Sequence, residues 1–122
     1  MKLTNNQIYD YATRLATEFS DNSLKLPIKV NFYLQKNKSA LMTLAQDLEQ
    51  NRQSIIENYG ELSEDGTQYI VPNDKVEAAQ QELADLFGLE QEVTIYKVNI
   101  DSLSDDLVLS AGQMEALMFM ID

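Results

Sequence analysis

Residues Pro27–Gly60, PIKVNFYLQKNKSALMTLAQDLEQNRQSIIENYG, decide the fold of this chain. Proline fits the first turn of a helix, and a glycine after the last turn commonly adopts the left-handed conformation that ends one. No glycine or proline lies between the two, so we predict one long helix over residues 27–59, with Gly60 as its left-handed cap. At 1.5 Å per residue this helix is about 50 Å long. A domain of this size cannot cover it alone, so we expect part of it to project or to meet a partner.

Apolar residues recur along this helix at alternating steps of four and three, which is the spacing of a coiled-coil seam. The series begins at Val30. Such a seam packs against another helix of the same chain or of a partner. We therefore take the rest of the series as candidate interaction residues: Leu34, Asn37, Leu41, Leu44, Leu48, Asn51 and Ile55.

Two of these positions, Asn37 and Asn51, hold an amide where an apolar residue would pack better. A buried asparagine can fix the register and the number of chains in a coiled coil, because its amide needs a specific partner there. Alternatively, the seam rotates and both side chains face water. The sequence does not separate the two interpretations. We expect a monomer or, in preference, a homo-oligomer.

Short signals mark the starts of other helices. Thr4 with Gln7 has the spacing of a capping box, Asp74 with Glu77 repeats it, and Ser110 can cap a short C-terminal helix. Runs of β-branched and aromatic residues indicate strands between them. The predicted elements are helices over 5–19, 74–87 and 111–121 and strands over 67–71 and 93–100.

These elements predict one domain over residues 1–122 of the α+β class, mostly helical. The helix over 74–87 is expected to fold back along the distal part of the long helix, which makes an antiparallel helical hairpin. The strands form a small two-stranded β element, and a short helix ends the chain.

The charge divides unevenly between the two halves of the chain. Residues 1–60 carry seven basic and six acidic side chains, net +1, whereas residues 61–122 carry two basic and fourteen acidic ones, net −12. An acidic block of this kind repels phosphate backbones and anionic lipids and attracts basic protein surfaces. Its candidate surface residues are Glu77, Glu82 and Asp85.

Basic residues are too few on the long helix to predict nucleic-acid binding. Lys29, Lys36 and Lys38 have no interleaved aromatic pattern that would mark such a surface, and the rest of the chain is anionic. We expect these lysines to meet the acidic half of the chain or to stay solvated. The sequence therefore predicts a protein partner and no direct contact with nucleic acid.

The residue inventory argues against catalysis. The chain has no histidine and no cysteine, and its four glycines form no phosphate-binding loop. No pocket arrangement of carboxylates, lysines or serines is recognisable. We expect a protein that is not an enzyme and that has no catalytic residues, no cofactor and no metal site.

No stretch of the sequence resembles a membrane segment or a secretion signal. A membrane helix needs about 20 consecutive apolar residues, and the N-terminal residues MKLTNNQ have no apolar run behind the lysine. We expect a cytoplasmic, soluble protein.

Four segments of the chain resemble a known but uncharacterised family. They are MKLTNNQIY at Met1–Tyr9, LPIKV at Leu26–Val30, ENYG at Glu57–Gly60 and LSAGQMEAL at Leu109–Leu117. The family consists of small proteins of phages and prophages of Gram-positive bacteria, so the resemblance implies a phage-type protein in the cytoplasm of a host bacterium. By association with late phage genes it also implies an accessory role in virion assembly. It implies no functional residues.

Two hypotheses of function follow. The first is a non-enzymatic protein that binds another phage protein through the helical seam during virion assembly. The alternative is an inhibitor of a host defence or nucleic-acid-handling enzyme, in which the acidic half occupies a basic groove. A carboxylate–metal enzyme is the third and weakest hypothesis.

Overall fold

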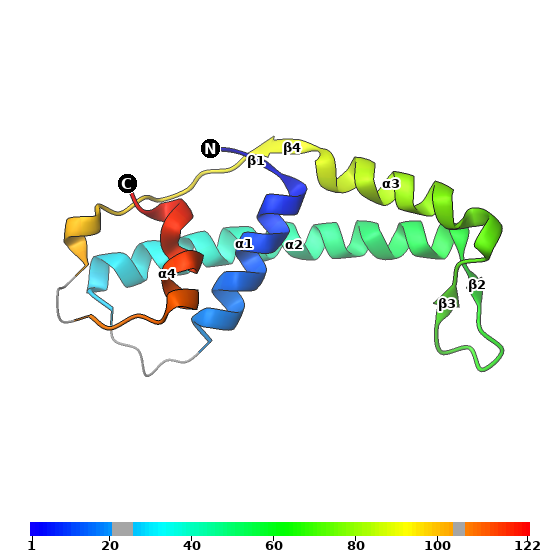
Figure 1. Cartoon of the computed structure of the whole chain (residues 1–122), viewed down its shortest axis with the longest axis horizontal. Coiled ribbons are helices and arrows are strands. Elements are labelled where there is room, and N and C mark those ends of the chain that lie inside the picture. Colours follow the sequence, from blue (N-terminus) through cyan, green and yellow to red (C-terminus); the bar gives the residue numbers. More distant parts are fainter. Residues whose placement is uncertain (21–25, 104–106) are drawn as a thin grey trace.

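Helix α2, Ile28–Tyr59, runs the length of the molecule, and the other elements pack along it (Figure 1). The computed structural model describes residues 1–20, 26–103 and 107–122. The predicted class is confirmed, because the fold is α+β and mostly helical, with a long helix in a helical hairpin and a short helix near the C-terminus.

The two ends of α2 differ from each other in how well they were predicted. Pro27 begins the helix as expected, and its carbonyl accepts the Asn31 N–H at 2.9 Å. Gly60 ends the helix, but the prediction of a left-handed cap is wrong, because its φ is −92°. A Cβ on Gly60 would lie 2.6 Å from the Ile56 carbonyl oxygen. Glycine is therefore required for close approach of the backbone, not for a positive φ.

Helix α1, Asn5–Glu18, packs against α2, and a second helix, α4, Ala111–Leu117, packs against α1. Helix α1 opens with the predicted capping box of Thr4 and Gln7. Helix α4 opens with a second capping box, in which the side chains of Ser110 and Gln113 each accept a hydrogen bond from the other residue's backbone N–H. The helix predicted over 111–121 ends early, because a 3₁₀ turn at Met118–Met120 replaces its last turn.

Helix α3, Val76–Gly88, packs along the distal half of α2 and completes the predicted helical hairpin (Figure 1). Its predicted cap is wrong. A 3₁₀ turn, Asn73–Lys75, follows Pro72, and no side chain caps α3 itself.

The strands form two separate antiparallel pairs. Strand β1, Lys2–Thr4, pairs with β4, Glu90–Glu92, and β2, Glu61–Leu62, pairs with β3, Tyr69–Ile70. The strand predicted over 67–71 is therefore reduced to two residues of a hairpin.

The strand predicted over 93–100 is wrong. Among the described residues, this segment forms no strand: Val93 exchanges two hydrogen bonds with Met1 at the end of the β1–β4 pair, and Val98 forms one bridge with Ile121. The reason is that the backbone of Tyr96 bonds to a side chain, that of Asn37, instead of to another strand.

The molecule divides into two parts, which we call the body and the arm. The arm is residues 49–90, namely the distal end of α2, the β2–β3 hairpin, α3 and the first residue of β4; the body is the remainder. Among the described residues, every buried member of the contiguous hydrophobic cluster lies in the body, and Ala79 is buried separately in the arm. The arm projects from it, and the hairpin projects from the end of the arm (Figure 1). Within the described residues, no helix is long and apolar enough to cross a membrane.

Candidate functional site

The predicted seam is largely covered by the chain itself. Leu34, Leu41 and Leu48 are buried in the core, where α1 packs against α2, α4 packs against α1, and the segment after β4 is hydrogen-bonded to α2. Leu44 and Ile55 are half-buried. The four buried apolar positions of the seam, Val30, Leu34, Leu41 and Leu48, therefore offer no exposed surface to a partner, because residues of the same chain cover them.

The two seam asparagines have different environments. Asn37 is fully buried, and its amide holds the backbone of Tyr96 by two hydrogen bonds of 2.8 Å, one donated to the carbonyl and one accepted from the N–H. Asn51 is exposed and donates to the Asp47 carbonyl of its own helix. Asn37 thus has a specific partner, as one interpretation required, but that partner belongs to the same chain. It fixes the position of the segment after β4, not the register of an oligomer.

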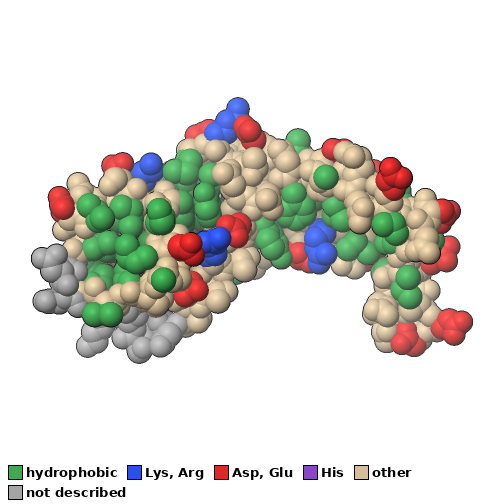
Figure 2. All heavy atoms as spheres, in the orientation of Figure 1, with side chains coloured by type: hydrophobic (Ala, Val, Ile, Leu, Met, Phe, Trp, Pro, Cys, Tyr) green, Lys and Arg blue, Asp and Glu red, His purple; other side chains and the backbone are tan. Residues whose placement is uncertain are grey.

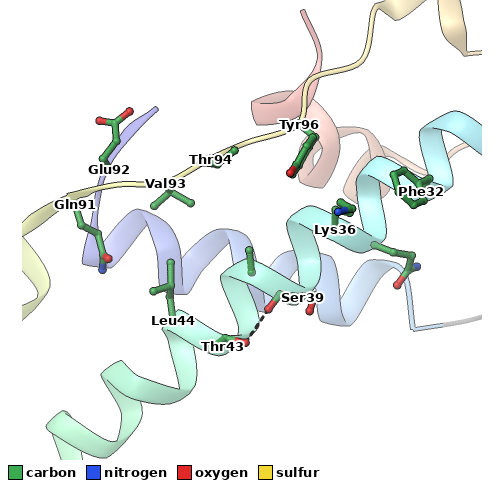
Figure 3. A pocket seen from close by; sticks show the side chains of 12 residues that line it. Phe32, Lys36, Ser39, Thr43, Leu44, Gln91, Glu92, Val93, Thr94 and Tyr96 are labelled. Carbon is green, nitrogen blue, oxygen red and sulfur yellow. Dashed lines mark hydrogen bonds between the residues drawn. The ribbon is translucent and has the colours of Figure 1, made fainter.

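A groove runs between α2 and the extended segment that contains β4 (Figure 3). Its volume is about 760 Å³. Helix α2 supplies one wall and residues 91–96 supply the other. The lining residues are Phe32, Gln35, Lys36, Ser39, Ala40, Thr43, Leu44, Gln91, Glu92, Val93, Thr94 and Tyr96.

One end of the groove combines a positive charge with aromatic rings. The Lys36 ammonium lies 5.4 Å from the ring centroids of both Phe32 and Tyr96, close enough for cation–π attraction. Tyr33 stacks on Tyr96 at 5.6 Å. Lys36 forms no salt bridge with any residue of 1–20, 26–103 or 107–122. The expectation that this lysine meets the acidic half of its own chain is not met among those residues.

The wall opposite α2 has a free strand edge. The Val93 N–H donates to the Met1 carbonyl, and the Met1 ammonium donates to the Val93 carbonyl, each at 2.9 Å. Because backbone groups alternate along a strand, those of Glu92 and Thr94 point away from β1. They have no hydrogen-bond partner among the described residues. Tyr96 is the next residue whose backbone points away from β1, and its N–H and carbonyl bond to Asn37 on α2. The free edge at Glu92 and Thr94 therefore faces the groove.

The predicted acidic surface lies on the arm. Glu77, Glu82 and Asp85 are all exposed on α3. Glu82 accepts a hydrogen bond of 3.0 Å from the Tyr59 hydroxyl, which raises the pKa of Tyr59 because the bond favours the neutral phenol. The Asp85 carboxylate accepts from the Gln81 amide at 2.9 Å. These contacts leave the carboxylates at the surface of α3.

Charge is concentrated on the arm. Residues 49–90 carry ten acidic and two basic side chains, net −8, whereas the rest of the chain carries ten acidic and seven basic ones, net −3. One of the two basic groups, Arg52, is paired with Glu49, and this pairing lowers the pKa of the Glu49 carboxyl. Figure 2 shows acidic side chains over the end of the arm and the hairpin.

The β2–β3 hairpin, residues 61–70, combines acidic and apolar groups; we call it the tip. Leu62, Tyr69 and Ile70 are exposed by 57%, 40% and 54%, so the tip has no core of its own. Asp65 accepts hydrogen bonds from Ser63 and Thr67, which lower its pKa and order the turn. Gly66 has a φ of +72°, a conformation that suits glycine.

The described residues contain no group of three or more acidic, histidine or cysteine side chains placed to hold a metal ion. Sequence reasoning identified the acidic residues of α3 but missed the groove and the tip. The tip's turn was recognisable from Glu64, Asp65 and Gly66, whereas the groove joins segments about fifty residues apart and has no local signal.

The chain was compared with protein-family models, with curated proteins and with solved structures, and it matches none of them.

Proposed function

We propose that this protein is not an enzyme and acts by binding another protein, and that the arm is its binding surface. The observation that carries the proposal is the placement of net charge −8 on an element that projects from the body. Fixed carboxylates on a projecting helix attract a basic protein surface and accelerate its association. The buried seam is not part of this proposal, because its residues stabilise the body.

The sequence suggests two classes of protein partner. An accessory role in virion assembly rests on the resemblance to phage proteins, and it requires a phage structural protein with a basic surface. Inhibition of a host defence or nucleic-acid-handling enzyme is favoured by the acidic arm, since its carboxylates can complement the positive charge of a groove that binds phosphates. Both roles use the same surface.

The experiment compares two variants that lose the same charge from different places. The arm variant carries Glu77→Gln, Glu82→Gln and Asp85→Asn, and the control carries Asp47→Asn, Asp101→Asn and Asp122→Asn on the body. All six residues are exposed, so both variants should fold. Tagged proteins are used to capture partners from uninfected and phage-infected lysates of one bacterial host, and the captured proteins are identified by mass spectrometry.

We expect a stoichiometric partner that binds the wild type and the body control and is lost from the arm variant. A phage structural protein as that partner supports assembly, whereas a host enzyme supports inhibition. Affinity for the purified partner should fall as salt rises, because exposed charges are screened. Equal capture by both variants would overturn the assignment of the arm.

A further inference from the structure

We propose that the tip of one copy docks into the groove of a second copy, so that the chain associates with itself head to tail. This inference concerns the groove and the tip and is independent of the carboxylates on α3. It rests on the match between the free backbone edge, charge and apolar surface of the groove and those of the tip.

The groove is built to receive a strand. The backbone groups of Glu92 and Thr94 point into it without partners among the described residues. An extended segment laid along such an edge gains backbone hydrogen bonds, while side chains beside the edge select its sequence. At one end of this edge, the Asn37 amide already bonds to the backbone of Tyr96. The length of edge that can pair with a second strand is therefore short.

The side chains of the groove specify an occupant with apolar and acidic residues. Phe32 is exposed by 56%, and Ala40 and the half-buried Leu44 supply further apolar surface. Lys36, between Phe32 and Tyr96, adds a cation at the same end (Figure 3). A carboxylate that approaches beside these rings is attracted by the Lys36 charge.

The tip meets each of these requirements. Its exposed apolar side chains, Leu62, Tyr69 and Ile70, lie beside the carboxylates of Glu61, Glu64 and Asp65. Ser63 donates its N–H to the Gln68 carbonyl, and hydrogen-bonded pairs alternate along antiparallel strands. The backbone of Tyr69 therefore points away from β2 and can bond to the edge at Glu92 and Thr94.

The two surfaces of one chain cannot meet each other. The α2 residues that line the groove span 32–44, and the tip begins after residue 60. At 1.5 Å per residue, a rigid helix holds them about 25 Å apart or more. A tip therefore fills the groove of another copy and leaves one tip and one groove free, which is a heterologous contact that forms rings or open chains.

The test uses two single variants and their mixture. Ile70→Asp alters only the tip and Lys36→Glu alters only the groove, and both residues are exposed. Controls with the same chemical changes elsewhere on the surface are Val108→Asp and Lys97→Glu, also at exposed positions. Circular dichroism establishes that each variant is folded, and sedimentation velocity is measured from about 10 µM to about 1 mM, a range that brackets micromolar association.

We expect wild type and both controls to form larger species as concentration rises, and each test variant to associate at least about tenfold more weakly. An equimolar mixture of the Ile70→Asp and Lys36→Glu proteins should form a dimer and nothing larger, because only one intact tip and one intact groove remain per pair. A wild type that stays monomeric, or a mixture that behaves as its components do, overturns the proposal. The arm variant with neutral α3 residues should still self-associate, so this test fails or succeeds separately from the proposed function.

Discussion

The body contains most of the buried core and the arm carries most of the net negative charge, although one continuous helix, α2, passes through both. In the body, α2 buries Val30, Leu34, Asn37 and Leu41 almost completely. In α3, all of whose residues are described, only Ala79 is buried, and the arm carries net charge −8. Local stability follows the density of buried contacts, so the arm can carry repelling charge because the body supplies the folding energy.

The largest effect should come from cavities made in the two parts. Leu41→Ala in the body should lower the free energy of unfolding by about 3–4 kcal/mol, because the fully buried side chain leaves a cavity. Leu83→Ala in the arm should cost only about 1 kcal/mol, because that side chain is half-buried. Urea unfolding followed by circular dichroism measures both losses. Equal losses would contradict the division between body and arm.

The two seam asparagines provide the next comparison. Asn37→Ala should cost about 2–3 kcal/mol, because it leaves the N–H and carbonyl of Tyr96 without their partner in the body. Asn51→Ala removes an exposed bond within the arm and should change stability by less than about 0.5 kcal/mol. Thermal melts of the two variants check the difference, and a large loss for Asn51→Ala would argue that it has a partner in solution.

A glycine at the base of the arm, Gly88, offers a small stabilising change. A Cβ at Gly88 meets no atom within 4 Å, and its φ is not positive. Gly88→Ala should therefore stabilise α3 by about 0.5 kcal/mol, since alanine has the higher helix propensity. Hydrogen exchange of α3 amides should slow while that of α1 amides is unchanged. Slowing in both helices would show that arm and body open together.

The smallest expected effect is a pH dependence at the start of the chain. The Met1 ammonium hydrogen-bonds to Glu92 at 2.8 Å and lowers the pKa of its carboxyl from 4.5. A lowered folded-state pKa stabilises the fold above pH 4.5, and that contribution is lost as the pH falls through the lowered value.

Comparing the free energy of unfolding at neutral and acid pH for wild type and Glu92→Gln isolates this contribution. The variant should lose part of the wild-type dependence on pH, whereas Glu64→Gln in the tip should retain it. Identical pH profiles for wild type and Glu92→Gln would show that the terminal ion pair adds nothing to stability.

Local signals predicted the helices, and contacts distant in sequence determined the rest. Thr4 with Gln7 and Ser110 mark their helices because a cap involves only neighbouring residues. Strand β1 was missed because its three residues become a strand only beside β4, some ninety positions away. The segment over 93–100 has the composition of a strand, but Asn37 takes the hydrogen bonds of Tyr96.

For the candidate surfaces too, the sequence predicted local features but not contacts between distant segments. The exposure of Glu77, Glu82 and Asp85 could be predicted, because charged residues on a helix face water by default. The covering of the seam could not, since heptad spacing is the same whether the covering residues come from the same chain or from a partner. Asn5 is a buried side chain that the sequence did not indicate; it donates to the Leu86 carbonyl and joins α1 to the base of the arm.

Hydrogen exchange along α2 tests the division between body and arm most directly, because one helix passes through both parts. Amides of residues 34–48 should be protected nearly to the global free energy of unfolding, whereas those of residues 52–59 should exchange faster through local opening. Uniform protection from one end of α2 to the other would contradict the account, since it would mean that the arm is as firmly packed as the body.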